Sequence, residues 1–486
     1  MSSTSKLSSS SSSSSPDPIP INEGQIEQVL KNCHHRDAVH VREILAKSLE
    51  LKGLDLEDVA VLANISDPGL LGEMFDAARR VKQAIYGSRL VLFAPMYVSN
   101  LCANECTYCA FRVRNKEIQR RALTQEEIAA ETLALIQQGH KRVLLVAGES
   151  YPDEGFNYVL KSIETIYATR SGNGEIRRVN ANIAPLSTEE FQQLKGASIG
   201  TYQLFQETYH RETYAKMHLA GRKRNYDWRV TAMDRAMQAG IDDVGVGVLF
   251  GLFDWRFELL ALMQHAKHLD QKFGVGPHTI SVPRLEPASG SSIASQPPHA
   301  VSDVDFRKIV AILRLAVPYT GIIMSTRETP NIRRETFSLG VSQISAGSRT
   351  NPGGYTVDGS VDDSTGGSVG NSTEQFSLGD HRPLDEVVRN IAELGYIPSF
   401  CTACYRLGRT GRDFMDLAKP GEIKNHCDPN AISTFLEYLI DFASPETKAV
   451  GERLIEQLLS NMDPRLQQIS RKMMDVVRTG KRDVFM

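Results

Sequence analysis

Short apolar runs alternate with amphipathic helical patterns through the middle of the chain. The runs are rich in branched residues and occupy positions 89–98, 142–147, 176–183, 198–204, 241–249, 278–283, 320–325 and 341–346. Between them, apolar residues recur three and four positions apart, which is typical of amphipathic helices. Thr124 with Glu127, and Ser187 with Glu190, have the spacing of capping boxes at two helix starts. This alternation predicts parallel βα units.

The number of units predicts the architecture. Eight βα units complete a (β/α)8 barrel of the TIM type, so we predict an α/β fold with that barrel over residues 89–349. In such barrels the chemistry takes place at the C-terminal ends of the strands. Residues 16–88 have helical spacing, and Gly53 and Gly87 end two of their segments. We therefore expect N-terminal helices packed against the barrel.

Three further segments differ from the barrel in composition. Residues 1–15 are almost all serine, cannot form a core and are predicted to be disordered. Residues 350–380 are rich in Gly, Ser, Asp and Thr, which predicts a long exposed loop. A loop of this length in an ordered protein is often functional. Residues 381–486 show mainly helical spacing and are expected to form a helical C-terminal extension.

Length and charge narrow the class of protein. The chain has 486 residues and a formal net charge of -3, so nothing favours a nucleic-acid partner. No apolar run reaches the roughly 20 residues that a membrane span requires, so we expect no membrane partner. Six of the seven cysteines lie in two tight groups, which indicates metal ligands in a reducing compartment. Cys33 is expected to be a plain buried or half-buried thiol.

The first cysteine group directly follows the first apolar run. Cys102, Cys106 and Cys109 have C-x3-C-x2-C spacing. Three thiolates can converge on one soft metal centre, and they suit a cubane iron–sulfur cluster whose last iron needs another ligand. Structural zinc prefers four ligands in two pairs, so a zinc knuckle, like simple buried thiols, is the weaker alternative. The expected barrel places this loop on its catalytic face.

The second group, Cys401, Cys404 and Cys427, has C-x2-C-x22-C spacing in the C-terminal extension. Again there are three thiolates, although His426 could complete a structural zinc site. A second iron–sulfur cluster with an open iron is the preferred interpretation. The sequence thus predicts two metal centres, each with an exchangeable position.

The first motif resembles that of the radical S-adenosylmethionine (SAM) enzymes. In that superfamily it binds a 4Fe-4S cluster, and the amine and carboxylate of SAM chelate the unique iron. The resemblance implies that Tyr108 lies near the adenine and that Ala147-Gly148-Glu149 replaces a Gly-Gly-Glu that contacts the SAM amine. The remaining candidates for cofactor binding stand at later strand ends: Asn182, Gln206, Glu207, Gly247 and Arg284.

Both cysteine motifs together resemble one family, HydG, the radical SAM tyrosine lyases that mature FeFe-hydrogenase. The likeness runs from about residue 55 to the C-terminus and includes Ser325-Thr-Arg-Glu328 and Cys401-Thr-Ala-Cys-Tyr-Arg-Leu-Gly-Arg-Thr-Gly411. The related ThiH lyases of thiazole biosynthesis share the barrel motifs but lack the C-terminal cysteine spacing. The extension therefore favours HydG.

The resemblance implies a reaction. The cluster on Cys102, Cys106 and Cys109 would reductively cleave SAM, and the 5′-deoxyadenosyl radical would abstract hydrogen from the amino group of tyrosine. Cleavage of the Cα–Cβ bond would give p-cresol and dehydroglycine, and dehydroglycine would give carbon monoxide and cyanide. The cluster on Cys401, Cys404 and Cys427 would carry a labile iron that collects these ligands as an Fe(CO)2CN synthon for the H-cluster.

Three residues receive separate roles from this resemblance. Arg327 would hold the tyrosine carboxylate, with Ser325 beside it. His278 would ligate the labile iron, and because it precedes its strand it belongs on the barrel face opposite the SAM cluster. A strand-start histidine bonded to backbone is the alternative. Two sites at opposite mouths predict an internal channel that protects reactive products from water.

The resemblance also implies partners: L-tyrosine, an electron donor, a second radical SAM protein, a GTPase scaffold and a hydrogenase. Two other functions stay open, a ThiH-like lyase that supplies dehydroglycine and a non-catalytic iron–sulfur scaffold or carrier. The leader lacks the apolar core of a secretory signal, so we expect a cytoplasmic protein. An organelle matrix, such as that of a hydrogenosome or plastid, is the alternative if the leader is a transit peptide.

Overall fold

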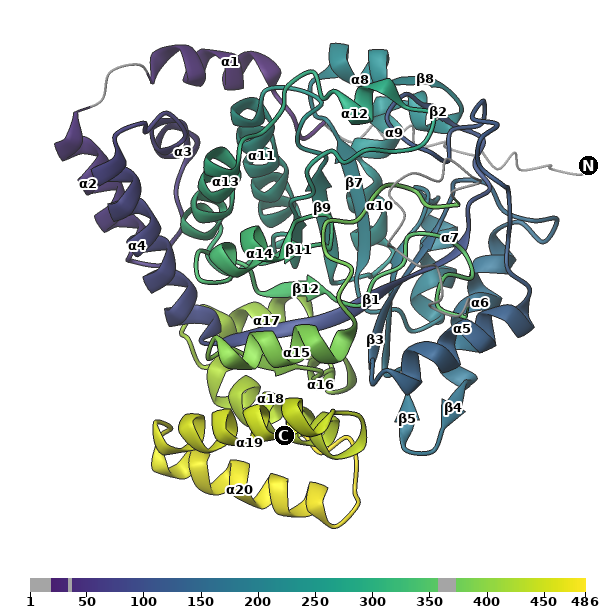
Figure 1. Ribbon diagram of the computed structural model, residues 1–486. Helices are drawn as coiled ribbons and strands as arrows, with labels where there is room; N and C mark the ends of the chain where they lie inside the picture. The colour runs from purple at the N-terminus through teal and green to yellow at the C-terminus, as the bar shows by residue number, and fades with distance from the viewer. Residues whose placement is uncertain (1–18, 34–36, 357–372) are drawn as a thin grey trace, which may run out of the picture.

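Eight parallel strands close into a barrel in the computed structural model, which describes residues 19–33, 37–356 and 373–486 (Figure 1). Every neighbouring pair is parallel, and the last strand pairs with the first, with Val91 opposite Gln343. The predicted (β/α)8 barrel is thus confirmed. Its strands are β1 (Arg89–Ser99), β3 (Arg142–Ala147), β6 (Arg178–Asn182), β7 (Tyr202–Glu207), β9 (Val244–Val248), β10 (Thr279–Ser281), β11 (Gly321–Met324) and β12 (Gln343–Ser345).

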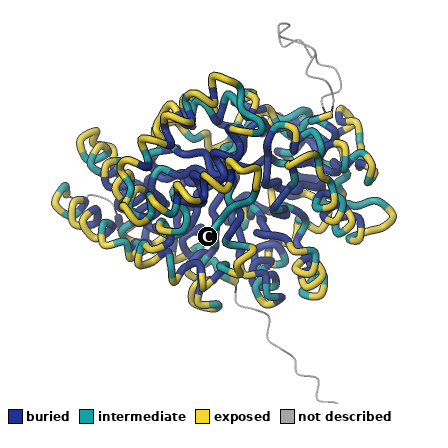
Figure 2. The backbone as a smooth tube through the Cα atoms, turned by 90° about the horizontal axis from the view of Figure 1, so that it is seen from below, coloured by how far each residue is buried: buried dark blue, intermediate teal, exposed yellow. Residues whose placement is uncertain are grey.

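Helices surround the barrel and cover its strands. Both predicted capping boxes are present, at Thr124 with Glu127 and at Ser187 with Glu190. The helices between strands are α5 (Gln125–Gln137), α6 (Phe156–Ala168), α7 (Thr188–Gly196), α8 (Arg211–Met217), η1 (Arg222–Arg224), α9 (Tyr226–Val230), α10 (Ala232–Gln238), α11 (Trp255–Phe273), α12 (Ser292–Ser295), α13 (Asp303–Ala316) and α14 (Pro330–Phe337). Figure 2 shows the buried backbone in the middle of the molecule, with exposed segments around the rim.

Four N-terminal helices pack on one flank of the barrel, at the purple end of the chain in Figure 1. They are α1 (Glu23–Asn32), α2 (Ala38–Ser48), α3 (Leu56–Ala63) and α4 (Pro68–Tyr86), and they contact α11 and α13. Cys33 is buried beside them, as expected for a plain thiol. The Ser-rich segment 1–15 lies outside the described residues, and the boundaries proposed for each region remain predictions.

The C-terminal extension contributes a strand that the helical spacing did not reveal. β13 (Ile397–Ser399) pairs in parallel with the start of β1, with Arg89 opposite Ile397 and Val91 opposite Ser399. Three residues including a proline are too short a run to stand out by periodicity. This pairing brings the extension to the N-terminal mouth of the barrel. Its helices are α15 (Leu384–Glu393), α16 (Ala403–Arg406), α17 (Gly411–Ala418), α18 (Ile423–Asp441), α19 (Pro445–Ser460) and α20 (Pro464–Arg478).

The predicted loop 350–380 contains no helix or strand in the parts that the structure describes, but most of those residues are not exposed. Thr350 and Asp380 are each only 1% exposed. The carboxylate of Asp380 pairs with buried Arg333 at 2.6 Å, and its backbone N–H donates to Thr326 O at 3.0 Å. Residues 373–380 therefore lie against the catalytic face. Residues 357–372 lie outside the described part of the chain.

Two small sheets complete the structure: β2 (Glu105–Cys106) with β8 (His218–Ala220), and β4 (Arg170–Ser171) with β5 (Gly174–Glu175), both antiparallel. Within the described residues, no helix has the length and apolarity needed to cross a bilayer.

Candidate active site and a second cysteine cavity

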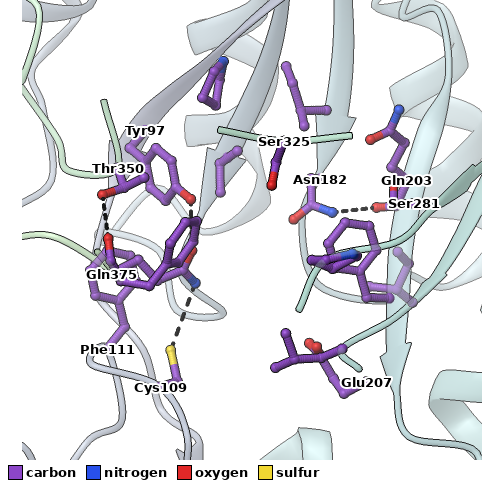
Figure 3. Close-up of a pocket in the computed structure, with 18 of the residues that line it drawn as sticks. Tyr97, Cys109, Phe111, Asn182, Gln203, Glu207, Ser281, Ser325, Thr350 and Gln375 are labelled. Atoms are coloured by element: carbon purple, nitrogen blue, oxygen red, sulfur yellow. Dashed lines mark hydrogen bonds between the residues drawn. The ribbon is translucent and has the colours of Figure 1, made fainter. Parts of the chain in front are cut away.

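The three cysteines of the first motif line a cavity at the C-terminal ends of the barrel strands (Figure 3). Cys106 is held by the two-residue strand β2, which pairs with β8, and the backbone N–H of Cys109 donates to Cys106 O at 3.1 Å. Tyr108 is buried beside them, and its hydroxyl lies 2.9 Å from the ring of His218. The structure therefore brings Cys102, Cys106, Cys109 and Tyr108 to one place, as the resemblance implied.

The end of β3 packs directly against the cysteine loop. A Cβ at Gly148 would lie 2.2 Å from Leu101 O, so no other residue fits there without moving one of the two segments. The next residue, Glu149, lines the same cavity. Gly148 thus allows the close approach that brings the Glu149 carboxylate alongside the cysteines.

Charged side chains of both signs surround the cysteines. Glu149 accepts hydrogen bonds from Asn104 Nδ2 and Arg229 Nη1, both at 2.8 Å. Lys223 Nζ donates to Glu207 at 2.6 Å, and both residues are largely buried. Paired carboxylates and cations suit a zwitterionic ligand, because the amino-acid part of SAM carries one group of each sign.

The thiols themselves need a metal in order to ionise. Burial raises the pKa of Cys102 and raises the pKa of Cys109 to about 11, so both are thiols at neutral pH. Within the described residues no three His, Cys, Asp or Glu side chains converge closely enough for a single ion. A four-iron cluster binds each thiolate to a different iron, so its ligands stand further apart. Three cysteine sulfurs suit such a cluster, whose last iron takes a further ligand.

Arg327 and Ser325 line the same cavity from the segment that follows β11. The Arg327 guanidinium stacks on Phe376, 3.3 Å from the ring centroid, and no carboxylate of the described residues pairs with it. Burial lowers the pKa of Arg327. The guanidinium is half-buried, and among the described residues its Nη1 donates only to Arg284 O, at 3.5 Å. Such a group is suited to a carboxylate supplied by a ligand.

The second cysteine group lines another cavity, at the N-terminal mouth of the barrel. Cys401 follows β13, and its carbonyl accepts a hydrogen bond from Arg142 at 2.9 Å. The Cys404 thiol donates to Cys427, which lowers the pKa of Cys427 to about 6. Arg89 also faces this cavity, and its buried Nη1 finds no hydrogen-bond partner in the described part of the chain. Three sulfurs beside an unpaired cation fit an anionic iron–sulfur centre.

His278 lies in that second cavity, just before β10. Its Nδ1 is 3.6 Å from Asp243 Oδ1, and its ring contacts Tyr405 and Phe414 edge-on. The Nε2 atom makes no hydrogen bond to the described residues. The carboxylate of Asp243 lies near one ring nitrogen, at 3.6 Å and beyond hydrogen-bond distance. In metal-ligating histidines a carboxylate often orients the ring through that second nitrogen.

Comparison with known proteins agrees with this geometry. Residues 96–263 match the family described as the radical SAM superfamily, and residues 281–397 match the biotin and thiamin synthesis associated domain. The chain is 30% identical over 367 residues to the 2-iminoacetate synthase of Escherichia coli (strain K12), which is 75% of this chain and 92% of that protein.

Two solved structures resemble the chain over almost its whole length. A crystal structure of HydG, a maturase of the [FeFe]-hydrogenase, is 48% identical, with a TM-score of 0.91, and covers 96% of this chain and 100% of that chain. The chain belongs to the HydG family of radical SAM enzymes. HydG from Carboxydothermus hydrogenoformans is 41% identical, with a TM-score of 0.81 and coverage of 94% and 97%. Membership of the radical SAM superfamily implies a 4Fe-4S cluster and SAM, and Cys102, Cys106 and Cys109 line one cavity.

Three predicted cofactor contacts are not among the residues that line the cavity of this HydG-family protein, and their roles stay predictions. Arg284 forms ion pairs with Glu328 and with Asp303, the latter at 2.8 Å. Gly247 faces the ring of Phe205, where a Cβ would be only 2.6 Å away. Gln206 is buried elsewhere, because the register shifts between Phe205 and Glu207 and Glu207 adopts a φ of 73°. That irregularity turns Glu207, rather than Gln206, into the cavity.

Of the other predicted positions, Gly148, Glu149, Asn182 and Glu207 do line the cavity. The sequence analysis missed several further lining residues of the HydG-family site. They are Tyr97, Asn104, Lys223, Arg229, Gln375 and Phe376. The basic run 222–224 was an available signal for Lys223, whereas nothing local marked Gln375 or Phe376 within a segment predicted to be an exposed loop.

Proposed function

We propose that this protein is an FeFe-hydrogenase maturase that cleaves L-tyrosine to p-cresol and dehydroglycine and converts dehydroglycine to carbon monoxide and cyanide. These would leave on iron as an Fe(CO)2CN synthon for H-cluster assembly. One observation carries the proposal: Cys401, Cys404, Cys427 and His278 share a cavity at the barrel mouth opposite the first cysteines. A lyase that released dehydroglycine would have no use for that second cavity.

The first cavity would bind SAM and the cluster together. When reduced, the cluster on Cys102, Cys106 and Cys109 would supply a 5′-deoxyadenosyl radical from SAM. The carboxylates of Glu149 and Glu207 suit the ammonium group of SAM, and Arg229 and Lys223 suit its carboxylate. Tyr108 is buried next to the last cysteine, where an apolar ring can cover an adenine.

Tyrosine would bind through its carboxylate to Arg327, beside the hydroxyl of Ser325. The Phe376 ring covers one side of the guanidinium, which helps to position the guanidinium before the substrate arrives. A positioned substrate places its amino group toward the cysteine side of the same cavity. Such prior orientation is the main contribution that a protein makes to a radical step carried by a cofactor.

One interior layer of the barrel supports a passage between the two cavities. Gln203, Gly245, Thr279 and Gly321 are register neighbours on β7, β9, β10 and β11. Gln203 lines the first cavity and Gly321 lines the second. Barrel interiors are normally filled by bulky branched residues. Here polar side chains lie against the glycines instead, and a Cβ at Gly245 would be 2.5 Å from Thr279 Oγ1 and 2.9 Å from Gln203 Cγ. We propose that dehydroglycine or its products pass through this layer.

The second cavity would hold an auxiliary cluster on Cys401, Cys404 and Cys427. Iron, the cargo in this proposal, would be bound by Nε2 of His278. Asp243 on the opposite ring nitrogen would fix the ring and its tautomer. The partners would be a second radical SAM protein, a GTPase scaffold and an electron donor. The protein would work in the cytoplasm or, alternatively, in an organelle matrix.

A second candidate function rests on the similarity to 2-iminoacetate synthase, which covers 92% of that protein. In this alternative the chain cleaves tyrosine and releases dehydroglycine, and the extension only holds an inert cluster. The similarity covers 75% of this chain, whereas the HydG structure covers 96%. The extra coverage favours the maturase.

The test uses anaerobically reconstituted protein with SAM, tyrosine and dithionite. We would measure p-cresol by chromatography, cyanide by derivatisation and iron-bound carbon monoxide by infrared spectroscopy, in the parent and in the Cys401→Ser/Cys404→Ser double variant. The maturase requires all three products in the parent, and p-cresol without iron-bound carbon monoxide in the variant. Equal product sets in both proteins favour the lyase, and SAM cleavage without p-cresol rules out tyrosine.

A further inference from the structure

The side-chain amide of Gln375 connects the wall of the first cavity to the cysteine loop (Figure 3). Its Oε1 accepts a hydrogen bond from the Tyr97 hydroxyl at 2.7 Å, and its Nε2 donates to Cys109 Sγ at 3.8 Å. We propose that Gln375 is a positioning residue that donates a hydrogen bond to the Cys109 thiolate and thereby raises the reduction potential of the cluster bound there.

Tyr97 determines which end of the amide faces the sulfur. Burial raises the pKa of Tyr97 far above neutrality, so the phenol keeps its proton and acts as a donor. A donor at Tyr97 requires the amide oxygen on that side, which leaves the NH2 group toward Cys109. A thiolate is an acceptor, so the two hydrogen bonds are mutually consistent.

The backbone around Gln375 is anchored independently of the cysteine loop. Its N–H donates to Thr350 O at 3.0 Å, and Ser377 N–H donates to Pro287 O at 2.9 Å. Two residues further on, Gly379 N–H donates to Thr326 O at 2.9 Å. The backbone that carries the amide is therefore held by segments on the catalytic face of the barrel. The position of the amide does not depend on the cysteine loop.

The electrostatic consequence follows from the charge on the sulfur. Reduction adds an electron that is shared with the cysteine sulfurs, and a hydrogen-bond donor stabilises that extra negative charge. Loss of the donor makes reduction harder and moves the potential to more negative values. Because the effect needs only the cluster, the proposal goes beyond tyrosine cleavage and does not depend on which substrate binds.

The test is a redox titration followed by electron paramagnetic resonance, without SAM or tyrosine. All proteins carry Cys401→Ser/Cys404→Ser, so that only the first cluster contributes a signal. Relative to this background, we expect Gln375→Leu to reduce the ratio of reduced to oxidised cluster at a fixed potential about tenfold, equal to about 59 mV for one electron. Gln375→Glu keeps the side-chain length and the acceptor for Tyr97 but places a negative charge beside the sulfur. We expect it to move the reduction potential of the cluster to still more negative values than Gln375→Leu does.

Gln203→Leu is the matched control, because Gln203 lines the same cavity from β7 but makes no hydrogen bond to a cysteine in the described part of the chain. It should leave the potential of the cluster unchanged. Iron and sulfide content and the melting temperature verify that each variant holds an intact cluster. An unchanged potential in Gln375→Leu, or an equal shift in Gln203→Leu, overturns the proposal, whatever the outcome of the tyrosine assay.

Discussion

The guanidinium of Arg284 pairs with the buried carboxylate of Glu328 on the catalytic face of the barrel. Glu328 directly follows Arg327 in the chain and is only 2% exposed. The nearest carboxylate in sequence to Arg327 is therefore neutralised by another arginine. This leaves the fork of Arg327, stacked on Phe376, to bind an anion from outside the protein.

Arg327→Gln tests that assignment. A hydrogen bond to a charged group contributes about 1.5–3 kcal/mol, so we expect kcat/KM for tyrosine to fall roughly 10- to 100-fold. SAM cleavage in the absence of tyrosine should stay near the parent rate, because Arg327 is not expected to hold the cofactor. Steady-state p-cresol and 5′-deoxyadenosine measurements separate the two effects.

Arg284→Gln is the paired control. It leaves Glu328 buried without its cation, and removing one partner of a buried pair costs about 3–5 kcal/mol. We expect a lower melting temperature for Arg284→Gln and little change for Arg327→Gln. The assignment fails if the two variants lose tyrosine activity equally with unchanged stability.

Gly148→Ala tests the contact between β3 and the cysteine loop. A Cβ there would lie 2.2 Å from Leu101 O, so the loop or the strand end must shift. We expect a lower iron content after reconstitution and weaker SAM binding, both measurable by iron assay and calorimetry. Gly196→Ala in α7 is the matched control, because its added Cβ meets nothing within 4 Å. Parent-like iron content and SAM affinity in Gly148→Ala would contradict the role of this contact.

The sequence predicted the barrel because its signal is repeated. All eight predicted runs overlap a barrel strand, and the capping boxes at Thr124 and Ser187 form as expected. Both cysteine groups and His278 were also predicted, since ligand spacing and position before a strand are local features. Strand β13 was not predicted, because its three residues acquire their conformation from pairing with β1.

The parts of the site that the sequence did not reveal depend on long-range contacts. A strand alternation cannot indicate that a register shift turns Glu207 rather than Gln206 into the cavity. The alternation also cannot indicate whether Arg284 or Arg327 forms the ion pair with Glu328. Gln375 reaches Cys109 across 266 positions, from a segment whose composition is typical of an exposed loop.

Thr279→Met tests the proposed passage through the barrel. Thr279 is a register neighbour of Gly245 and Gly321 in the layer between the cavities, and its side chain already lies against both glycines, so a longer side chain should obstruct this layer. We expect p-cresol formation near the parent rate and a loss of at least tenfold in iron-bound carbon monoxide. Thr279→Ser keeps the layer open and should behave as the parent. The passage is excluded if Thr279→Met and Thr279→Ser give the same infrared signal.

Glu258, on α11, makes folding stability depend on pH. Its carboxyl group is buried and accepts hydrogen bonds from the Thr208 hydroxyl and, at 2.8 Å, from Tyr209 N–H. Burial raises its pKa to about 8, against an ordinary 4.5. Between these values the folded protein holds one proton more than the unfolded chain, so rising pH favours unfolding.

Glu258→Gln should remove that dependence, because an amide keeps the shape and carries no ionisable proton. Each pH unit in the window is worth at most about 1.4 kcal/mol, so the parent should lose about 2 kcal/mol of stability from this group between roughly pH 6.5 and 8. Denaturant unfolding at both pH values measures the difference, with exposed Glu164→Gln as the control for loss of a carboxylate. If Glu258→Gln loses as much stability as the parent over this interval, the carboxyl group is already ionised at pH 6.5, and hydrogen bonds from Thr208 and Tyr209 outweigh its burial.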